Sequence, residues 1–219
     1  MHELCRRRNL PHWDISGGTY FVTCCLAGSI PAGGHLAIRK AMDRTPSSDR
    51  FVEEKDHTRE SRSPFIDFAE HEHRLDSPCI ARWLADRRLA CTVRDAMLYF
   101  ANNRYELLAY TVMPSHVHWV FKPLPAWVAG LRIRGERRTA REVVLHSFCR
   151  HTGLVCNRML GRAGRFWQHE SYDRVVRSHE ELQRTVEYIE FNPVKAGLCT
   201  RSEEWEFSSA WGGGSMASQ

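Results

Sequence analysis

Residues 105–122 read YELLAYTVMPSHVHWVFK, and this stretch contains two strand patterns separated by a short turn. The first half is apolar and aromatic, a composition that favours β-strands. The tripeptide MPS interrupts this pattern. Along residues 116–122 the side chains should then alternate between the two faces of a second strand. Because successive side chains of a strand point to opposite faces, Val117, Trp119 and Phe121 should share one buried side. A connection this short predicts an antiparallel strand pair.

Other strands and helices are expected on both sides of this hairpin. Residues 19–26 follow two glycines and are rich in β-branched and aromatic residues, which predicts a buried strand. From residue 80 to residue 101, apolar residues recur at helical spacing, so two short helices are expected. Residues 171–177 are expected to form a short strand or a loop.

The last predicted helix begins at Ser178. Ser178 is followed three residues later by Glu181, which is the capping-box pattern of a helix N-terminus. The helix should run through Leu182 and Val186. It should end before Pro193, because the residue that precedes a proline disfavours helical backbone.

The positive charge of the chain is concentrated in one segment. The chain has 219 residues, and its 31 Lys and Arg against 26 Asp and Glu give a net charge of +5. Residues 132–165 alone hold nine arginines against two glutamates, a local charge of +7, so the remainder is slightly acidic. We therefore expect residues 127–165 to form a basic helical segment that binds phosphate groups. Its arginines are Arg132, Arg134, Arg137, Arg138, Arg141, Arg150, Arg158, Arg162 and Arg165.

Composition also limits the class of protein. With 42% hydrophobic and 26% charged residues, wholesale disorder is excluded. No stretch approaches the roughly 18–20 apolar residues that span a bilayer, and no apolar run follows the basic N-terminus. The eight cysteines include no Cys-x-x-Cys pair, which argues against a four-cysteine zinc site and favours reduced thiols in the cytoplasm. Residues 43–64 are expected to form a variable loop or insertion, and residues 212–219 a disordered tail.

His116 and His118 are two residues apart on the second predicted strand, so both imidazoles should project from one face. Two neutral imidazoles held on one strand can chelate a divalent ion. They do not fill a coordination sphere, so oxygen ligands from a phosphate, water or a third side chain would have to complete it. The alternative is that one histidine caps a core pocket while the other lies at the surface.

Tyr188 lies near the C-terminal end of the helix that begins at Ser178, and Asn192 lies four residues on, on the same helix face. A tyrosine hydroxyl can act as a covalent nucleophile when its oxygen is oriented by a nearby cation. The side-chain oxygen of Asn192 can supply a third metal ligand. The alternative is ordinary packing, which is the more common role of a tyrosine on an amphipathic helix.

Four segments occur in the order of a known family: GGTYFVT at 17–23, VMPSHVH at 112–118, FWQHESYD at 166–173 and YIEFNPVKAGL at 188–198. With these motifs the chain resembles the REP-associated tyrosine transposases, relatives of the single-strand transposases in the HUH nuclease superfamily. HUH stands for His, hydrophobic residue, His, and His116-Val117-His118 matches it. The resemblance covers residues 10–211 as one domain and is weakest over 43–64 and through the basic segment.

The resemblance implies an α+β fold, in which an antiparallel sheet is sandwiched by helices as in ferredoxin-like or RRM-like proteins. It implies that His116, His118 and Asn192 bind Mg²⁺ or Mn²⁺. It also implies that Tyr188 attacks a DNA phosphate, which leaves a 5′-phosphotyrosine link and a free 3′-hydroxyl for a second reaction. The implied substrate is single-stranded DNA folded into hairpins. The family commonly has Asn where this chain has Ser115, and serine can still make the turn hydrogen bond.

DNA is thus the expected partner, rather than a membrane or a small-molecule substrate, and a nucleoid-associated location is expected. Trp127 and Trp167 are candidates for stacking on unpaired bases, although burial is the more common role of Trp. Two other functions stay open: a catalytically silent relative that only binds structured DNA, and an RNA-binding protein. The strands lack the aromatic stacking motif of RNA-recognition modules, which argues against the latter. A monomer is favoured over a dimer.

Overall fold

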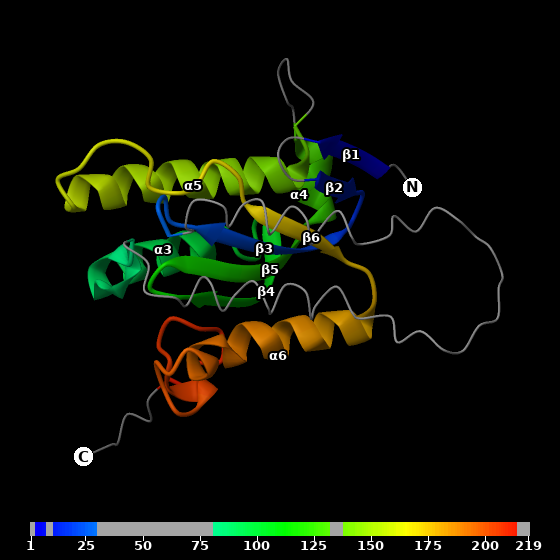
Figure 1. The fold of residues 1–219 in the computed structure, drawn as a ribbon. Coiled ribbons are helices and arrows are strands. Elements are labelled where there is room, and N and C mark those ends of the chain that lie inside the picture. Colours follow the sequence, from blue (N-terminus) through cyan, green and yellow to red (C-terminus); the bar gives the residue numbers. More distant parts are fainter. Residues whose placement is uncertain (1–2, 8–10, 30–80, 132–137, 214–219) are drawn as a thin grey trace.

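The computed structural model describes residues 3–7, 11–29, 81–131 and 138–213 (Figure 1). Parts of the sequence prediction lie outside these ranges. They are the loop at 43–64, most of the tail at 212–219, and the three arginines Arg132, Arg134 and Arg137.

A four-stranded antiparallel sheet forms the centre of the fold, with the strand order β4-β5-β3-β6. Its strands are β3 (Thr19–Cys25), β4 (Tyr105–Val112), β5 (His116–Pro123) and β6 (Tyr172–Val176). The predicted hairpin is confirmed, since β4 and β5 pair antiparallel across the turn. A separate two-stranded sheet contains β1 (Glu3–Arg7) and β2 (Pro11–Ile15).

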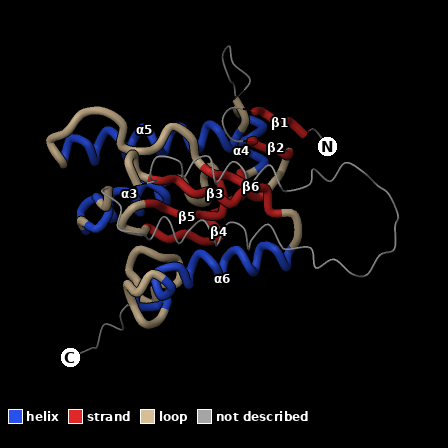
Figure 2. The backbone as a smooth tube through the Cα atoms, in the orientation of Figure 1, coloured by secondary structure: helices blue, strands red, loops and turns tan. Residues whose placement is uncertain are grey.

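Helices cover both faces of the central sheet, as Figures 1 and 2 show. The long helix α5 (Ala140–Met159) lies on one face together with α3 (Arg87–Tyr99), and α6 (His179–Lys195) lies on the other. The 3-10 turns η1 (Trp83–Ala85) and η2 (Ser202–Glu204) and the short helix α4 (Pro125–Gly130) complete the described elements. The predicted α+β sandwich is thereby confirmed. Within the described ranges, no helix is long and apolar enough to cross a bilayer.

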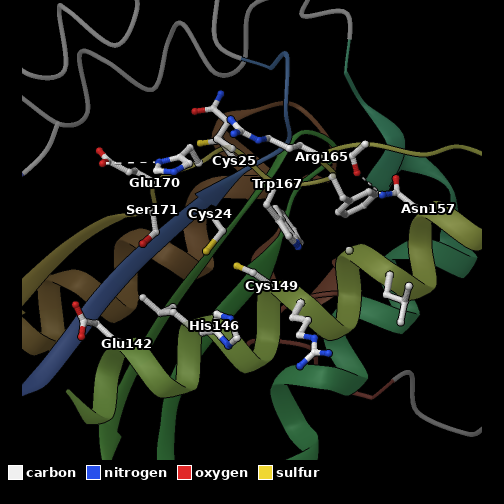
Figure 3. Close-up of a pocket in the computed structure, with 18 of the residues that line it drawn as sticks. Cys24, Cys25, Glu142, His146, Cys149, Asn157, Arg165, Trp167, Glu170 and Ser171 are labelled. Atoms are coloured by element: carbon white, nitrogen blue, oxygen red, sulfur yellow. Dashed lines mark hydrogen bonds and ion pairs between the residues drawn. The ribbon is translucent and has the colours of Figure 1, made fainter. Parts of the chain in front are cut away.

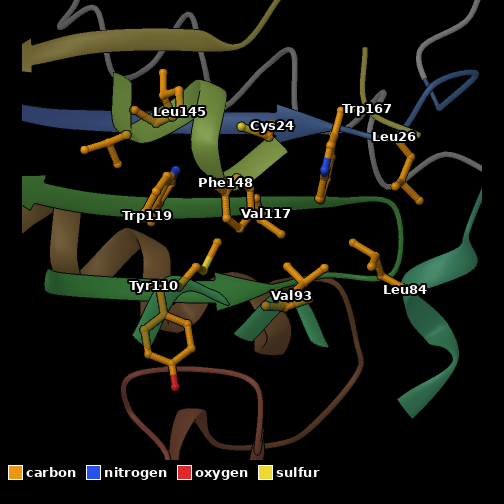
Figure 4. Packing of buried hydrophobic residues seen from close by; sticks show 14 of the residues in the cluster. Cys24, Leu26, Leu84, Val93, Tyr110, Val117, Trp119, Leu145, Phe148 and Trp167 are labelled. Atoms are coloured by element: carbon orange, nitrogen blue, oxygen red, sulfur yellow. The ribbon is translucent and has the colours of Figure 1, made fainter. Parts of the chain in front are cut away.

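The alternation of β5 divides the core into two layers. Val117, Trp119 and Phe121 belong to the large cluster between the sheet and α3 and α5, where the ring of Trp119 lies tilted against Phe148 with 5.0 Å between the ring centroids (Figure 4). Val120 faces the opposite way and packs with Ile189 of α6. Because the alternation is strict, the histidines on either side of Val117 must face α6.

Helix α6 begins as predicted but ends later. Ser178 Oγ accepts a hydrogen bond from the backbone N–H of Glu181 at 3.1 Å, which caps the first turn. The predicted end before Pro193 is wrong, because the helix runs on to Lys195. Proline removes one donor, yet the carbonyl groups of Asn192 and Pro193 still accept bonds from Ala196 and Leu198. A proline in the last turn therefore interrupts little of the hydrogen-bond ladder.

Candidate functional site

The two histidines of the predicted pair lie side by side on the face of the sheet that α6 covers. His116 and His118 are 1% and 0% exposed, and their ring centroids lie 4.6 Å apart at an interplanar angle of 67°. Because both histidines belong to strand β5, no loop has to become ordered to set this spacing. The predicted shared face is confirmed, and the alternative in which one histidine lies at the surface does not hold.

Each imidazole has a hydroxyl group at its Nδ1 atom. Ser115 Oγ lies 2.9 Å from Nδ1 of His116, and Thr23 Oγ1 lies 2.7 Å from Nδ1 of His118. Ser115 comes from the turn, while Thr23 comes from β3, where it is the register partner of His118. No local pattern pointed to Thr23, because its contact with His118 depends on the pairing of strands whose residues lie 95 positions apart. Its place in the GGTYFVT motif was the one available signal.

Tyr188 reaches this pair from α6. Its ring centroid lies 5.8 Å from that of His118, and both rings contact Phe21 of β3 at 6.1 and 5.7 Å. The side chain of Tyr188 is half-buried at the edge of the cluster around Phe21. Two segments 70 residues apart in sequence, the strand with the histidines and the helix with the tyrosine, are thus brought into contact.

Asn192 lies one helical turn beyond Tyr188 on the same buried side and is 2% exposed. Two imidazoles and one amide oxygen can each ligate a divalent cation, and phosphate and water would supply the further oxygen ligands that Mg²⁺ and Mn²⁺ favour. The described residues contain no group of three or more His, Cys, Asp or Glu able to hold a metal by themselves. The residues present therefore fit a site with three protein ligands, in which water or phosphate oxygens would fill the remaining positions.

A basic cavity lies on the opposite face of the sheet. It has a volume of about 1070 Å³ and lies between α5, the end of β3 and residues 162–171 (Figure 3). All six arginines of the predicted basic segment that the structure describes line it: Arg138, Arg141, Arg150, Arg158, Arg162 and Arg165. Four of them are exposed, and Arg162 lies over the ring of Trp83 at 3.8 Å. The described arginines of the predicted segment thus line one cavity.

Arg141 differs from the other arginines, because its side chain is buried and paired with carboxylates. Its side chain is 2% exposed and binds Asp14 of β2 through two bonds of 2.9 and 2.8 Å. A third contact joins it to Asp173 of β6 at 3.0 Å. Burial by itself would lower the pKa of Arg141, but the bonds to Asp14 and the charge of Asp173 outweigh it and raise that pKa. Arg141 therefore joins α5 to two strands and presents no free charge to a ligand.

The two tryptophans suggested for base stacking are packed instead. Trp167 is 6% exposed, and its Nε1–H donates to Thr152 Oγ1 at 2.8 Å. Trp127 is half-buried against the large core cluster, with Arg104 above its ring at 6.0 Å. For Trp167 the more common role, burial, is thus confirmed, because its indole packs against Phe148 of α5.

The chain is similar to proteins of one kind, although no protein-family model matches it. Over 112 residues, the chain is 27% identical to a protein described as a REP-associated tyrosine transposase in Haemophilus influenzae, a match that covers 48% of this chain and 58% of the relative. It is 25% identical over 118 residues to a REP-associated tyrosine transposase of Escherichia coli K12, covering 53% and 62% of the two chains. The matches thus span less than two thirds of each relative.

A solved structure extends the likeness to nearly the whole chain. The structure of a REP-associated tyrosine transposase bound to a REP hairpin superimposes with a TM-score of 0.50 at 18% identity. The superposition covers 94% of this chain and 82% of the other. At this identity the likeness concerns the fold. The chain is therefore similar in sequence to REP-associated tyrosine transposases and shares the fold of one of them.

Proposed function

We propose that this chain cleaves and rejoins single-stranded DNA that folds into hairpins, with Tyr188 as the covalent nucleophile. The observation that carries the proposal is the contact of the Tyr188 ring with His118, which itself lies against His116. The proposed nucleophile and the two imidazoles lie together on the face of the sheet that α6 covers, and Asn192 lies one helical turn from Tyr188. That combination suits phosphoryl transfer to a side chain.

In the proposed reaction the Oη atom of Tyr188 attacks a DNA phosphorus. A bond forms between Oη and phosphorus, and the bond from phosphorus to the 3′-oxygen breaks. The phenol loses its proton and the departing 3′-oxygen gains one, so the products are a 5′-phosphotyrosine and a 3′-hydroxyl. A second 3′-hydroxyl or water can then attack the same phosphorus and release the tyrosine. The link retains the energy of the phosphodiester, which suits strand transfer.

His116, His118 and Asn192 are the proposed ligands of Mg²⁺ or Mn²⁺. Such an ion supplies Lewis-acid stabilisation of the charge on the phosphate. The protein's own part is to keep both imidazoles rigid and to exclude water from their buried side, where Phe21 stacks on His118 with an interplanar angle of 19°. This rigidity lowers the entropy cost of placing the phosphate against Tyr188.

The basic cavity is the proposed contact surface for the DNA backbone. Its exposed arginines Arg138, Arg150, Arg158 and Arg165 can bind phosphates without regard to sequence. The structural relative is bound to a REP hairpin, and we propose a hairpin of this kind as the substrate here. The cavity and the tyrosine lie on opposite faces, so a bound strand would have to pass around the end of the sheet.

Residues 10–211 would act as one HUH domain, and we favour a monomer in the cytoplasm, associated with the nucleoid.

A covalent-adduct assay tests the nucleophile. A hairpin with single-stranded flanks, labelled at its 3′ end, would be incubated with the protein and Mn²⁺ and resolved on a denaturing gel. The 3′ label is needed because the fragment with the 5′-phosphate is the one that stays on the tyrosine. We expect a labelled protein band with the wild type and none with Tyr188→Phe, while hairpin binding persists in both.

Tyr172→Phe is the matched control. Tyr172 also contacts Phe21 on the same face of the sheet, with 6.5 Å between ring centroids. Its removal should leave the adduct intact. Loss of the adduct in Tyr172→Phe but not in Tyr188→Phe would show that the nucleophile is Tyr172 of β6. A wild type that binds the hairpin but forms no adduct would favour the alternative of a silent DNA-binding protein.

A further inference from the structure

The hydroxyl groups at the histidine pair carry an inference that rests on the proposed function and extends it. Both hydrogen bonds, from Thr23 Oγ1 to His118 and from Ser115 Oγ to His116, are buried. A hydroxyl can donate or accept, and an imidazole nitrogen can do either according to its tautomer. The direction of each bond therefore decides which ring nitrogen carries the proton.

We propose that Thr23 and Ser115 are positioning residues that accept a hydrogen bond from Nδ1–H of the two histidines, so that Nε2 of each ring is the atom that binds the divalent cation. Metal-binding histidines generally donate their other ring N–H to an oxygen, which fixes the tautomer and the ring orientation. Here a hydroxyl lies 2.7 or 2.9 Å from each Nδ1. Nδ1 is thus occupied, and Nε2 remains as the ligand.

Thr23 can be tested without disturbing the packing of the ring. Thr23 is 1% exposed, and Val has nearly the same shape, so Thr23→Val removes the hydroxyl and leaves no large cavity. The ring of His118 keeps its stacking on Phe21 at 5.7 Å. What the substitution removes is the acceptor for Nδ1–H, and with it the preference for one tautomer.

The chain offers a matched control on the other side of the same histidine. Thr111 of β4 is the second register partner of His118 and is 0% exposed. Its hydroxyl points to the sulfur of Met113 at 3.9 Å. Thr111→Val is therefore the same chemical change beside the same ring, and it leaves the hydrogen bond between Thr23 and His118 intact.

The first measurement is Mn²⁺ affinity of the full chain without DNA, followed by electron paramagnetic resonance. Loss of an outer hydrogen-bond partner typically weakens metal binding about 10–100-fold. We expect a loss of that size for Thr23→Val and for Ser115→Ala. Thr23→Ser should restore affinity, and Thr111→Val should match the wild type. Equal affinities of Thr23→Val and Thr111→Val would overturn the proposal.

The second measurement needs neither metal nor DNA. The ¹⁵N chemical shifts of the imidazole of His118 report which nitrogen is protonated. We expect the Nδ1–H tautomer in the wild type and in Thr111→Val, and a mixture of tautomers in Thr23→Val. An Nε2–H tautomer in the wild type would overturn the proposal even if the protein formed a DNA adduct. Conversely, failure of the adduct assay with the expected shifts and Mn²⁺ affinities would count against Tyr188 and not against Thr23.

Discussion

Replacement of Arg141 by methionine should destabilise the fold severely while leaving the proposed DNA-contact surface in place. The guanidinium is 2% exposed, and the side chains of its partners Asp14 and Asp173 are 7% and 0% exposed. Arg141→Met would keep much of the volume but leave two buried carboxylates without their counter-ion. Breaking a buried ion pair in this way costs about 3–5 kcal/mol. For a protein of this size, each kcal/mol lowers Tm by about 2–4 °C, so a fall of about 6–20 °C is expected.

Urea unfolding followed by circular dichroism measures this loss, with Arg150→Met as the control. Arg150 lies on the same helix but is exposed, so its free energy of unfolding should change by no more than about 0.5 kcal/mol. Hairpin affinity, measured well below the Tm of each variant, should fall for Arg150→Met and stay near the wild-type value for Arg141→Met. An Arg141→Met protein of wild-type stability that has lost hairpin binding would refute the structural role of Arg141.

Two further results are expected from exposed residues. Arg150→Ala and Arg158→Ala should each weaken hairpin binding and reduce the slope of log K against log salt by about 0.7–0.9, as a lost phosphate contact does; unchanged slopes in a salt titration would place the DNA elsewhere. Hydrogen bonds from the Thr200 side chain, from Arg201 and from the Thr200 backbone lower the pKa of Glu204 to about 2. This contribution to stability is present above the unfolded pKa near 4.5 and is lost as the pH falls towards 2. The difference in Tm between the wild type and Glu204→Gln should therefore shrink over that range. A constant difference would contradict the lowered pKa of Glu204.

The hairpin and the shared face of the histidines could be predicted because they depend on local rules. A period of two along residues 116–122 sets which side chains share a face, whatever the rest of the chain does. The contact between Tyr188 and His118 is different. It depends on how α6 packs on the sheet, which no local pattern specifies. The contact could be expected only from the resemblance that the four ordered motifs carry, because the number of residues between His118 and Tyr188 indicates nothing about it.

The structure departs from the local rules at Arg141 and at Pro193, and each departure has a definite cause. Charge counting treats every arginine alike, whereas Arg141 is withdrawn from solvent by Asp14 and Asp173, residues that precede and follow it in sequence by more than 30 positions. The rule for residues before proline describes a preference. At Pro193 the packing of α6 on the sheet outweighs that preference, and the helix continues to Lys195.

Peptide mapping of the DNA adduct tests the central claim most directly. Trypsin should release residues 185–195 as one peptide, TVEYIEFNPVK, in which Tyr188 is the only tyrosine. After reaction with a hairpin and Mn²⁺ and digestion of the DNA, we predict that this peptide carries a 5′-linked nucleotide on Tyr188. The same modification on a peptide that contains Tyr172, or a cleaved hairpin with no modified peptide at all, would contradict the assignment of Tyr188 as the nucleophile.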